Sequence, residues 1–315
     1  MSDSSSGGVA EGKRRSKLAE FFIRLVKEKP LGTVGGVITL LLLLTGIFAD
    51  FLAPYGMNEI HVGNFLEPPS AKFWLGTDNL GRDMLSRIIF GARVSMIVGL
   101  VAATIATLLS ALIGIMSGYI GGKFDLAVQR FVDVWTCFPG LILVLTIMSL
   151  IGLGMWKVII VLGIRYGISG SRIIRGAVMS VKENVYVQAA EAIGCSTPRI
   201  LIRHILPNVM APIIVLLTTR LPLMILIEAS LSFLGFGIPP PTPSWGGMLS
   251  GAGRSYMFQS PGLAIWPGLA LSITVFSVNM FGDALRDLLD PRLRGGVGRY
   301  GVRKAKKDAS KPSNP

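Results

Sequence analysis

A long apolar run near the start of the chain restricts its fold more than any other feature. Residues Leu31 to Leu52 contain a single charged side chain, Asp50. As an α-helix rising about 1.5 Å per residue, the run is about 33 Å long, enough to cross a hydrocarbon core of about 30 Å. Basic residues precede it, as in a secretory signal, but signals carry only about 7 to 15 apolar residues. We predict an uncleaved first membrane span.

The composition supports a membrane environment. Hydrophobic residues make up 51% of the chain and charged residues 16%, whereas soluble domains carry about a quarter charged residues. The net charge of +13 comes from tails and connecting segments rather than from a folded basic face, so we predict no nucleic-acid partner. Two cysteines form neither a disulfide framework nor a four-ligand zinc site.

Five further apolar segments predict an all-α, polytopic membrane protein with six transmembrane helices. They are expected at residues 94–119, 134–151, 156–174, 205–235 and 263–281. The fourth span contains Arg165 and Arg172, and each central charge costs at least about 2.5 kcal/mol on insertion scales. Six spans place both basic tails in the cytoplasm, as the positive-inside rule favours. We therefore expect a multi-pass protein of the cytoplasmic (inner) membrane.

The same reasoning divides the chain into three parts. Residues 1–30 are expected to form a basic cytoplasmic tail, residues 31–290 the transmembrane domain, and residues 291–315 a second basic tail. Residues 1–12 and 303–315 are rich in Ser, Gly, Lys and Pro, a composition that cannot bury enough apolar surface to fold. We predict that both are disordered.

The expected cytoplasmic segment before the fifth span contains small residues at informative positions. Ala189, Ala190 and Gly194 would let a short helix starting near Glu183 lie close against another protein, and Gly194 permits a turn. Pro207 has the preset φ angle that suits the start of the next span.

This segment resembles the EAA loop of ATP-binding-cassette (ABC) importer permeases. Gln188 replaces that family's acidic residue and His204 its isoleucine, while the ending from Arg203 to Asn208 resembles the peptide-permease branch. The resemblance implies that residues of about 180–207 dock on a cytoplasmic ATPase and transmit its movement. The expected coupling residues are Glu183, Gln188, Ala189, Ala190, Glu191, Gly194, Thr197, Leu206 and Pro207.

A second signature lies before the second span. The stretch from Leu75 to Ser95 is similar to the outward segment of dipeptide, oligopeptide and nickel permeases. Thr77 or Asp78 is expected to cap a helix, and Asp83 and Arg87 stand four residues apart on it. A lid or receptor contact and a purely structural helix both remain open. The polar residues singled out here are Asp78, Arg82, Asp83 and Arg87.

A third signature runs from Glu228 to Gly247 and again resembles the peptide branch. An acidic residue within a span is expected to face a cavity or a partner. Glu228 would bind a peptide ammonium group or form an ion pair at a subunit interface. Arg220 lies about 12 Å along the helix and about 80° around it, so the two cannot pair. The candidate pathway residues are Glu228, Arg220, Arg165 and Ser232.

Two further expectations concern the outer loop and the end of the last span. Trp245 follows a proline-rich stretch and is expected at the membrane interface. The segment from Gly282 to Arg294 resembles the peptide branch, with expected ion pairs Asp283–Arg286 and Asp290–Arg294.

Together the signatures resemble a permease of an ABC importer with the type I fold from about residue 30 to residue 294. The resemblance implies a homologous second permease, two ATPase subunits and an extracytoplasmic substrate-binding protein. The chain has no phosphate-binding Walker loop and no expected cofactor, so partner subunits would bind ATP and magnesium. Di- and oligopeptides are the favoured substrates, with nickel, glutathione and oligosaccharides as alternatives. An ATP-independent channel is the rival function.

Overall fold

Residues 17–289 are described by a computed structural model, with side chains from residue 23 onward. Its longer helices are α1 (Lys17–Glu28), α2 (Pro30–Ile47), α4 (Met84–Ile120), α5 (Gly122–Cys137), α6 (Gly140–Ile151), α7 (Met155–Lys182), α8 (Val185–Ala192), α10 (Leu206–Phe233) and α13 (Gly262–Leu289). Short elements are α3 (Ala49–Leu52), α9 (Thr197–Ile200), η1 (Leu201–Ile205), α11 (Trp245–Met248), η2 (Leu249–Gly253) and α12 (Arg254–Tyr256). The described part contains no strand, and the predicted all-α class is confirmed.

Most of the expected tails lies outside the described residues. The predicted disordered segments 1–12 and 303–315, and the expected tail 291–315, are not described. Helix α1 occupies part of the expected N-terminal tail, where Leu25 is buried against Ala284 and Leu288 of α13. The division of the chain into three parts stays a prediction.

The expected spans fall on long helices. Four helical segments are long and apolar enough to cross a membrane: α2, α4, the continuous stretch from Thr197 to Phe233, and α13. Helix α7 holds the expected fourth span; it has 28 residues and is therefore about 42 Å long. It carries Arg165, Arg172 and Arg175, so its interior is less apolar than that of the other four.

The expected third span is not one straight helix. Helices α5 and α6 meet at a bend of 86°, whereas the sequence prediction ran through it. Pro139 explains the break, because it lacks an N–H group and pushes the preceding residue out of the helical region. Phe138 accordingly has φ −80° and ψ 132°. The bent pair counts as a fifth candidate span.

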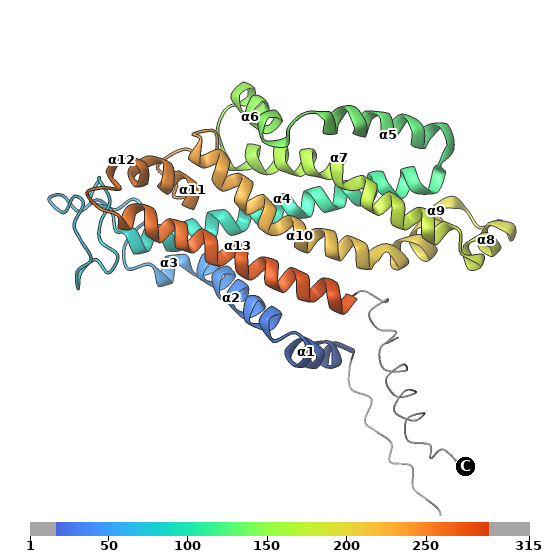
Figure 1. Cartoon of the computed structure of the whole chain (residues 1–315), viewed down its shortest axis with the longest axis horizontal. Coiled ribbons are helices and arrows are strands. Elements are labelled where there is room, and N and C mark those ends of the chain that lie inside the picture. The colour runs from blue at the N-terminus through green and yellow to red at the C-terminus, as the bar shows by residue number, and fades with distance from the viewer. Residues whose placement is uncertain (1–16, 290–315) are drawn as a thin grey trace, which may run out of the picture.

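Small residues allow the long helices to approach closely. Helices α4 and α7 run side by side along much of their length, and α2 lies against α13 (Figure 1). A methyl group at Gly114 of α4 would lie 2.6 Å from the carbonyl oxygen of Ser171 in α7. One at Gly35 of α2 would lie 2.6 Å from the carbonyl oxygen of Ser277 in α13. Such glycine contacts are typical of helix packing in membranes.

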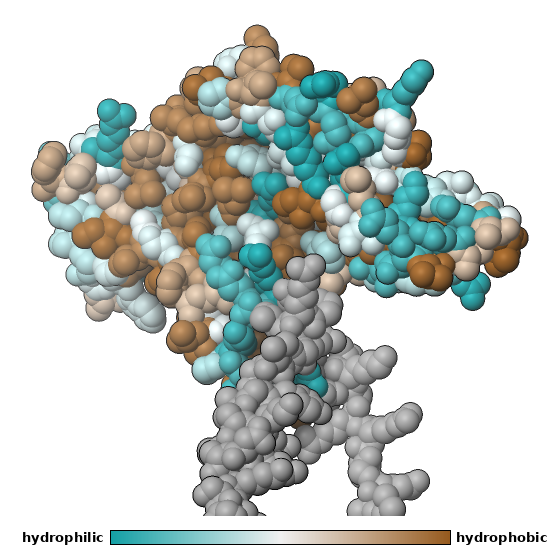
Figure 2. All heavy atoms as spheres, turned by 45° about the vertical axis from the view of Figure 1, so that its right-hand side comes forward, coloured by the Kyte–Doolittle hydropathy of each residue, from teal (hydrophilic) through white to brown (hydrophobic). Residues whose placement is uncertain are grey.

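The short elements gather at the two ends of the bundle. Helices α8 and α9 lie at one end, and α11, α12 and the segment between α3 and α4 lie at the other (Figure 1). In Figure 2 the middle of the visible face is mostly hydrophobic, while hydrophilic residues cover much of the projecting lobe that contains α8 and α9. The expected coupling segment and the expected outward segment are therefore at opposite ends.

Candidate functional site: a coupling helix, an outer cavity and two intramembrane polar groups

Helix α8, in the expected coupling segment, has a buried face and an exposed face. Val187 and Ala190 are buried in a cluster with Ile174 and Val178 of α7 and with residues of α9 and η1. On the opposite face Val185 is 79% exposed, and Ile193, just after the helix, is 80% exposed. Gln188, Ala189, Glu191, Gly194 and Thr197 are also exposed. The exposed apolar side chains are free to contact another protein.

Hydrogen bonds join the coupling segment to the end of α4. The hydroxyl of Tyr119 donates to Oε1 of Glu191 at 2.9 Å. The ammonium group of Lys182 donates to the carbonyl oxygen of Tyr119 at 2.7 Å. A displacement of α8 would therefore act directly on α4, the longest helix of the bundle.

The chain turns at Gly194, as expected, but Pro207 does not stand at the start of the next span. Gly194 has φ +80°, a conformation that other residues rarely adopt. Glu183 directly follows α7. Leu206 and Pro207 begin α10, but α9 and the π-helical turn η1 already extend this helix back to Thr197. Pro207 therefore lies inside a longer helical segment rather than at its beginning.

The outward segment is folded around Asp78 and Asp83, with roles that the sequence did not predict. Asp83, rather than Thr77 or Asp78, caps α4 by accepting a hydrogen bond from the backbone N–H of Ser86 at 2.7 Å. Arg87 contacts Asp78 at 3.6 Å instead of Asp83. Arg82 also pairs with Asp78, at 2.7 Å. Because Asp83 is itself the cap, its carboxylate faces the backbone and Arg87 turns to the preceding loop.

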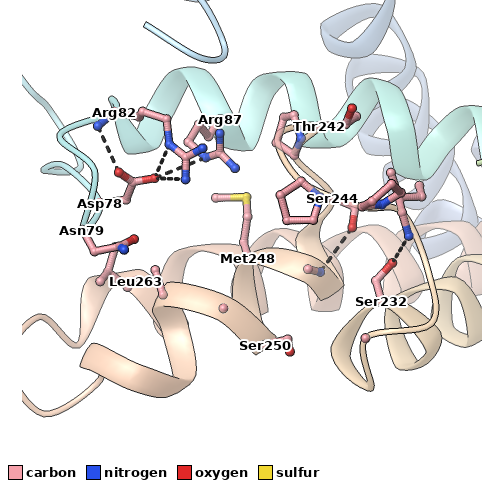
Figure 3. A pocket seen from close by; sticks show the side chains of 18 of the residues that line it. Asp78, Asn79, Arg82, Arg87, Ser232, Thr242, Ser244, Met248, Ser250 and Leu263 are labelled. Atoms are coloured by element: carbon pink, nitrogen blue, oxygen red, sulfur yellow. Dashed lines mark hydrogen bonds and ion pairs between the residues drawn. The ribbon is translucent and has the colours of Figure 1, made fainter. Parts of the chain in front are cut away.

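A cavity of about 240 Å³ connects this segment with the end of α10. Asp78, Arg82 and Arg87 line one side of it, and Ser232 and Met248 line the other (Figure 3). The proline-rich loop from Pro239 to Pro243 closes part of the wall. Asp83 is not among the lining residues. The cavity brings two of the sequence signatures together at the same end of the bundle.

Trp245, expected at the membrane interface, is buried inside the protein rather than exposed on its surface. Its side chain is fully buried, packs with Met84 and Ala92 of α4, and donates from Nε1 to the carbonyl oxygen of Ile88 at 3.2 Å. Gly91 leaves room for the ring, since a methyl group there would lie 2.9 Å from it. Trp245 therefore fastens the loop after α10 to the start of α4.

Glu228 and Ser232 form one of the two intramembrane polar groups. Glu228 is fully buried, and its Oε1 atom accepts a hydrogen bond from the hydroxyl of Ser232 at 2.7 Å. Ser232 in turn accepts from the backbone N–H of Ile238 at 3.2 Å (Figure 3). No described basic side chain pairs with Glu228. The group connects α10 to the loop that follows it.

Arg165 and Arg220 form the other group, around Tyr166 of α7. The guanidinium carbons lie 5.7 Å (Arg165) and 5.3 Å (Arg220) from the centre of the Tyr166 ring. Arg165 donates from Nη2 to the carbonyl oxygen of Phe138, in the break between α5 and α6, at 3.3 Å. The four candidate pathway residues are thus divided into two pairs. Sequence reasoning missed Tyr166 and the break, although Pro139 signals the latter.

Of the two ion pairs expected at the end of the last span, the one that lies on described residues does not form. Asp283 and Arg286, both described, make no ion pair with each other; Asp287 instead pairs with Lys29 at 2.5 Å. The second expected pair, Asp290–Arg294, lies outside the described residues. Lys29 lies between α1 and α2, so this contact joins the first and last membrane helices.

Comparison with known sequences assigns the family. The sequence model described as "Binding-protein-dependent transport system inner membrane component" matches residues 110–295. The chain belongs to this family. A second model, "N-terminal TM domain of oligopeptide transport permease C", matches residues 16–69. The chain is therefore an ABC importer permease, a multi-pass protein of the inner membrane, and the resemblance to the dipeptide and oligopeptide branch is confirmed.

Individual relatives and a solved structure agree with this family. The glutathione transport system permease protein GsiD of Pectobacterium atrosepticum is 37% identical over 89% of the permease and 93% of the relative. The protein of the same name from Escherichia coli is 38% identical over 87% and 90%. A chain of the MetNI methionine ABC transporter in an inward-facing conformation shares 16% identity, with a TM-score of 0.53 over 66% of the permease and 98% of that chain. This likeness supports the ABC permease fold.

Proposed function

We propose that the permease forms half of the translocation pathway of an ATP-driven importer of small peptides. A homologous second permease supplies the other half, and two ATPase subunits that bind ATP and magnesium act from the cytoplasm. An extracytoplasmic binding protein delivers the substrate. Both termini lie in the cytoplasm, and the permease itself hydrolyses nothing.

The single observation that carries the coupling role is the exposed apolar face of α8. Val185 and Ile193 are each about four-fifths exposed, at the end of the bundle where polar rather than lipid-facing surface dominates (Figure 2). Such a patch in water marks a protein contact. Because α8 is joined to α4 through Tyr119 and Glu191, an ATPase that moves α8 would also move the membrane helices.

The relatives and the family branch favour a peptide substrate. The relatives are named for glutathione transport, and glutathione is a tripeptide. Peptides and glutathione share free carboxylates and an ammonium group, which suit a pathway containing charged side chains. Import of nickel or oligosaccharides by the same architecture is the alternative.

The position of the second permease follows from α5 and α6. Both helices expose large apolar side chains, such as Phe131 and Ile142. They also lie beside charged groups, including the ion pair between Asp133 and Arg172. Lipid alone is a poor environment for such charges. We infer that this side of the bundle faces the pathway and the second permease.

Purification of the tagged permease in mild detergent tests the assembly. We expect ATPase polypeptides and a second permease to co-purify, and the reconstituted complex to take up glutathione or trialanine only with ATP and the binding protein. The double variant Val185→Asp/Ile193→Asp should insert normally but lose the ATPases, since it places charges on the docking face. Lys123→Asp adds an acid at the same end, on α5, and should retain them.

Either part of the proposal fails on a distinct result. If the double variant keeps its ATPases and its transport, α8 is not the docking surface. If the wild-type chain purifies as a stable homo-oligomer and conducts solute without ATP, the channel function is correct instead.

A further inference from the structure

Two cationic side chains without a carboxylate partner lie halfway along the bundle. Arg220 is the fifteenth residue of α10 (Leu206–Phe233), about 21 Å from the start of that helix. Neither Arg165 nor Arg220 forms an ion pair with any carboxylate of residues 23–289. A charge in the middle of a membrane helix is costly, and such residues usually mark a substrate or ion pathway.

Arg165 is buried and incompletely satisfied. It is 6% exposed, and its Nε atom has no hydrogen-bond partner among the described residues. Within residues 23–289, Nη2 makes the one hydrogen bond of this guanidinium, to the carbonyl oxygen of Phe138. A buried guanidinium with an open donor is costly unless a ligand or a partner completes it.

The start of α6 lies directly against this guanidinium. A methyl group at Gly140, the first residue of α6, would lie 3.6 Å from Nη2 of Arg165 and 3.4 Å from the hydroxyl of Tyr166. No side chain caps α6, whose N-cap residue is Pro139. The uncapped start of a helix carries free N–H groups and partial positive charge, which attract anions. Half-helices inside membranes use this end to hold anionic groups of substrates.

Arg220 approaches the same place from α10. Its Nη2 atom would lie 3.3 Å from a methyl group at Gly170, so the absence of a side chain there lets the guanidinium lie against α7. Arg220 is only partly buried and makes no hydrogen bond within the described part of the chain. Its donors are therefore available to a ligand that enters beside Tyr166.

We propose that Arg165, Arg220 and the start of α6 form a binding station for the free carboxylate of the transported peptide. Three sources of positive potential converge there, and a planar carboxylate matches the forked donors of arginine. The station rests on the proposed peptide-import function and adds a chemical requirement to it. A substrate needs a free carboxylate, which both peptides and glutathione have, to pass efficiently.

The test compares a peptide acid with its amide in the complete complex. Wild-type and variant complexes, reconstituted with ATPases, second permease and saturating binding protein, are assayed for ATP-driven uptake of trialanine and of trialanine amide. Any preference of the binding protein is the same in every complex, so a change in the acid-to-amide uptake ratio reports the permease alone. We expect this ratio to fall about tenfold in Arg220→Gln, the loss of one hydrogen-bonded charge pair.

Three further variants make the result specific. Arg220→Lys and Arg165→Lys keep the charge but lose the fork, and should lower the ratio less than Arg220→Gln. Arg93→Gln removes a cation from α4, one that pairs with Asp50, and should leave the ratio unchanged. The lysine variants also provide a readout if the neutral variant does not assemble.

Two results would overturn the station. One is an equal loss of acid and amide uptake in Arg220→Gln, accompanied by loss of the second permease on purification, because the arginine would then pair with a carboxylate of that partner. The other is an unchanged ratio in all four variants. If the wild-type complex imports neither trialanine nor glutathione, the peptide function itself is wrong.

Discussion

The two ends of the helix bundle differ in how far the chain satisfies its own side chains. The end that holds α11 and α12 is called the outer end below, and the end that holds α8 the coupling end, after the roles proposed for them. At the outer end Trp245 is fully buried and Asp78 and Asp83 are 3% and 2% exposed, each with partners from the same chain. At the opposite end, Val185 and Ile193 are about 80% exposed on and beside α8. Both ends expose some apolar side chains, such as Trp74 at the outer end, which is 68% exposed; the difference is that the acidic and aromatic signature residues of the outer end are buried and partnered, whereas the proposed docking residues Val185 and Ile193 are not.

The difference indicates what each end is for. Burial of apolar surface stabilises the outer end by about 25 cal/mol per Å², and its buried carboxylates are paired or capped. At the coupling end, Val185 and Ile193 stay exposed, as we propose for a surface that a partner covers. Substitutions at the outer end should therefore destabilise the permease alone, whereas exposed positions at the coupling end should affect the complex.

The largest effect on stability is expected from Trp245→Ala. Removing a fully buried indole that packs on α4 should lower the free energy of unfolding by about 3–5 kcal/mol. Thermal unfolding of the purified permease in detergent measures the change. Trp74→Ala is the matched control, because Trp74 belongs to the same end but is 68% exposed. Equal shifts for the two variants would contradict a stabilising role of the buried indole.

A smaller loss is expected from Val187→Ala at the coupling end. Val187 is fully buried, and truncating it should cost about 2 kcal/mol in transfer and cavity terms. Val185→Ala, two residues earlier and 79% exposed, should leave the isolated permease unchanged. The same melting measurement, made without ATPases, separates the two faces of α8. A comparable loss in Val185→Ala would mean that this face packs within the chain.

Apolar periods and runs allowed much of the fold to be predicted, because spans depend on local composition. Four of the expected spans each fall on a single continuous helical segment, whereas the first, expected at residues 31–52, runs past the end of α2 at Ile47 into the separate helix α3. The third was wrong at Phe138, where an otherwise apolar run conceals the effect of Pro139. That proline was readable in the sequence, but the direction of the 86° bend depends on packing against α7.

The candidate sites were less predictable because their partners are distant in sequence. The spacing correctly excluded a pair between Arg220 and Glu228. It did not reveal that Arg220 of α10 lies over the ring of Tyr166 in α7, or that Trp245 donates a hydrogen bond to the carbonyl oxygen of Ile88. Likewise Asp78 pairs with Arg87 only because the outward loop folds back on α4. Helical spacing describes neighbours on one helix, whereas these contacts arise between helices.

A modest effect is expected from Tyr119→Phe, which removes the hydrogen bond to Glu191. The bond is 2.9 Å long but its acceptor is exposed, so the free energy of unfolding should fall by about 1 kcal/mol or less. Transport per ATP hydrolysed should fall more noticeably, since α8 would no longer be fastened to α4. Substrate uptake and ATP hydrolysis, measured in the same proteoliposomes, give the number of substrate molecules transported per ATP. An unchanged ratio would remove this bond from the coupling path.

The smallest effect is expected from Asp50→Asn, which removes the carboxylate of the exposed pair between Asp50 and Arg93 at the outer end. Arg93 donates to the Asp50 carboxylate at 2.7 Å, and this hydrogen bond holds the pKa of Asp50 below its usual value. A lowered pKa means that the pair stabilises the folded state fully above the unfolded pKa of about 3.9 and loses this contribution as the pH falls through the lower folded value. Exposed pairs contribute little, so wild type and variant should melt together at pH 7. Their melting temperatures should also stay together in acid. A difference at pH 7 that vanishes near pH 3 would contradict this prediction, because it would show that even this exposed pair stabilises the outer end.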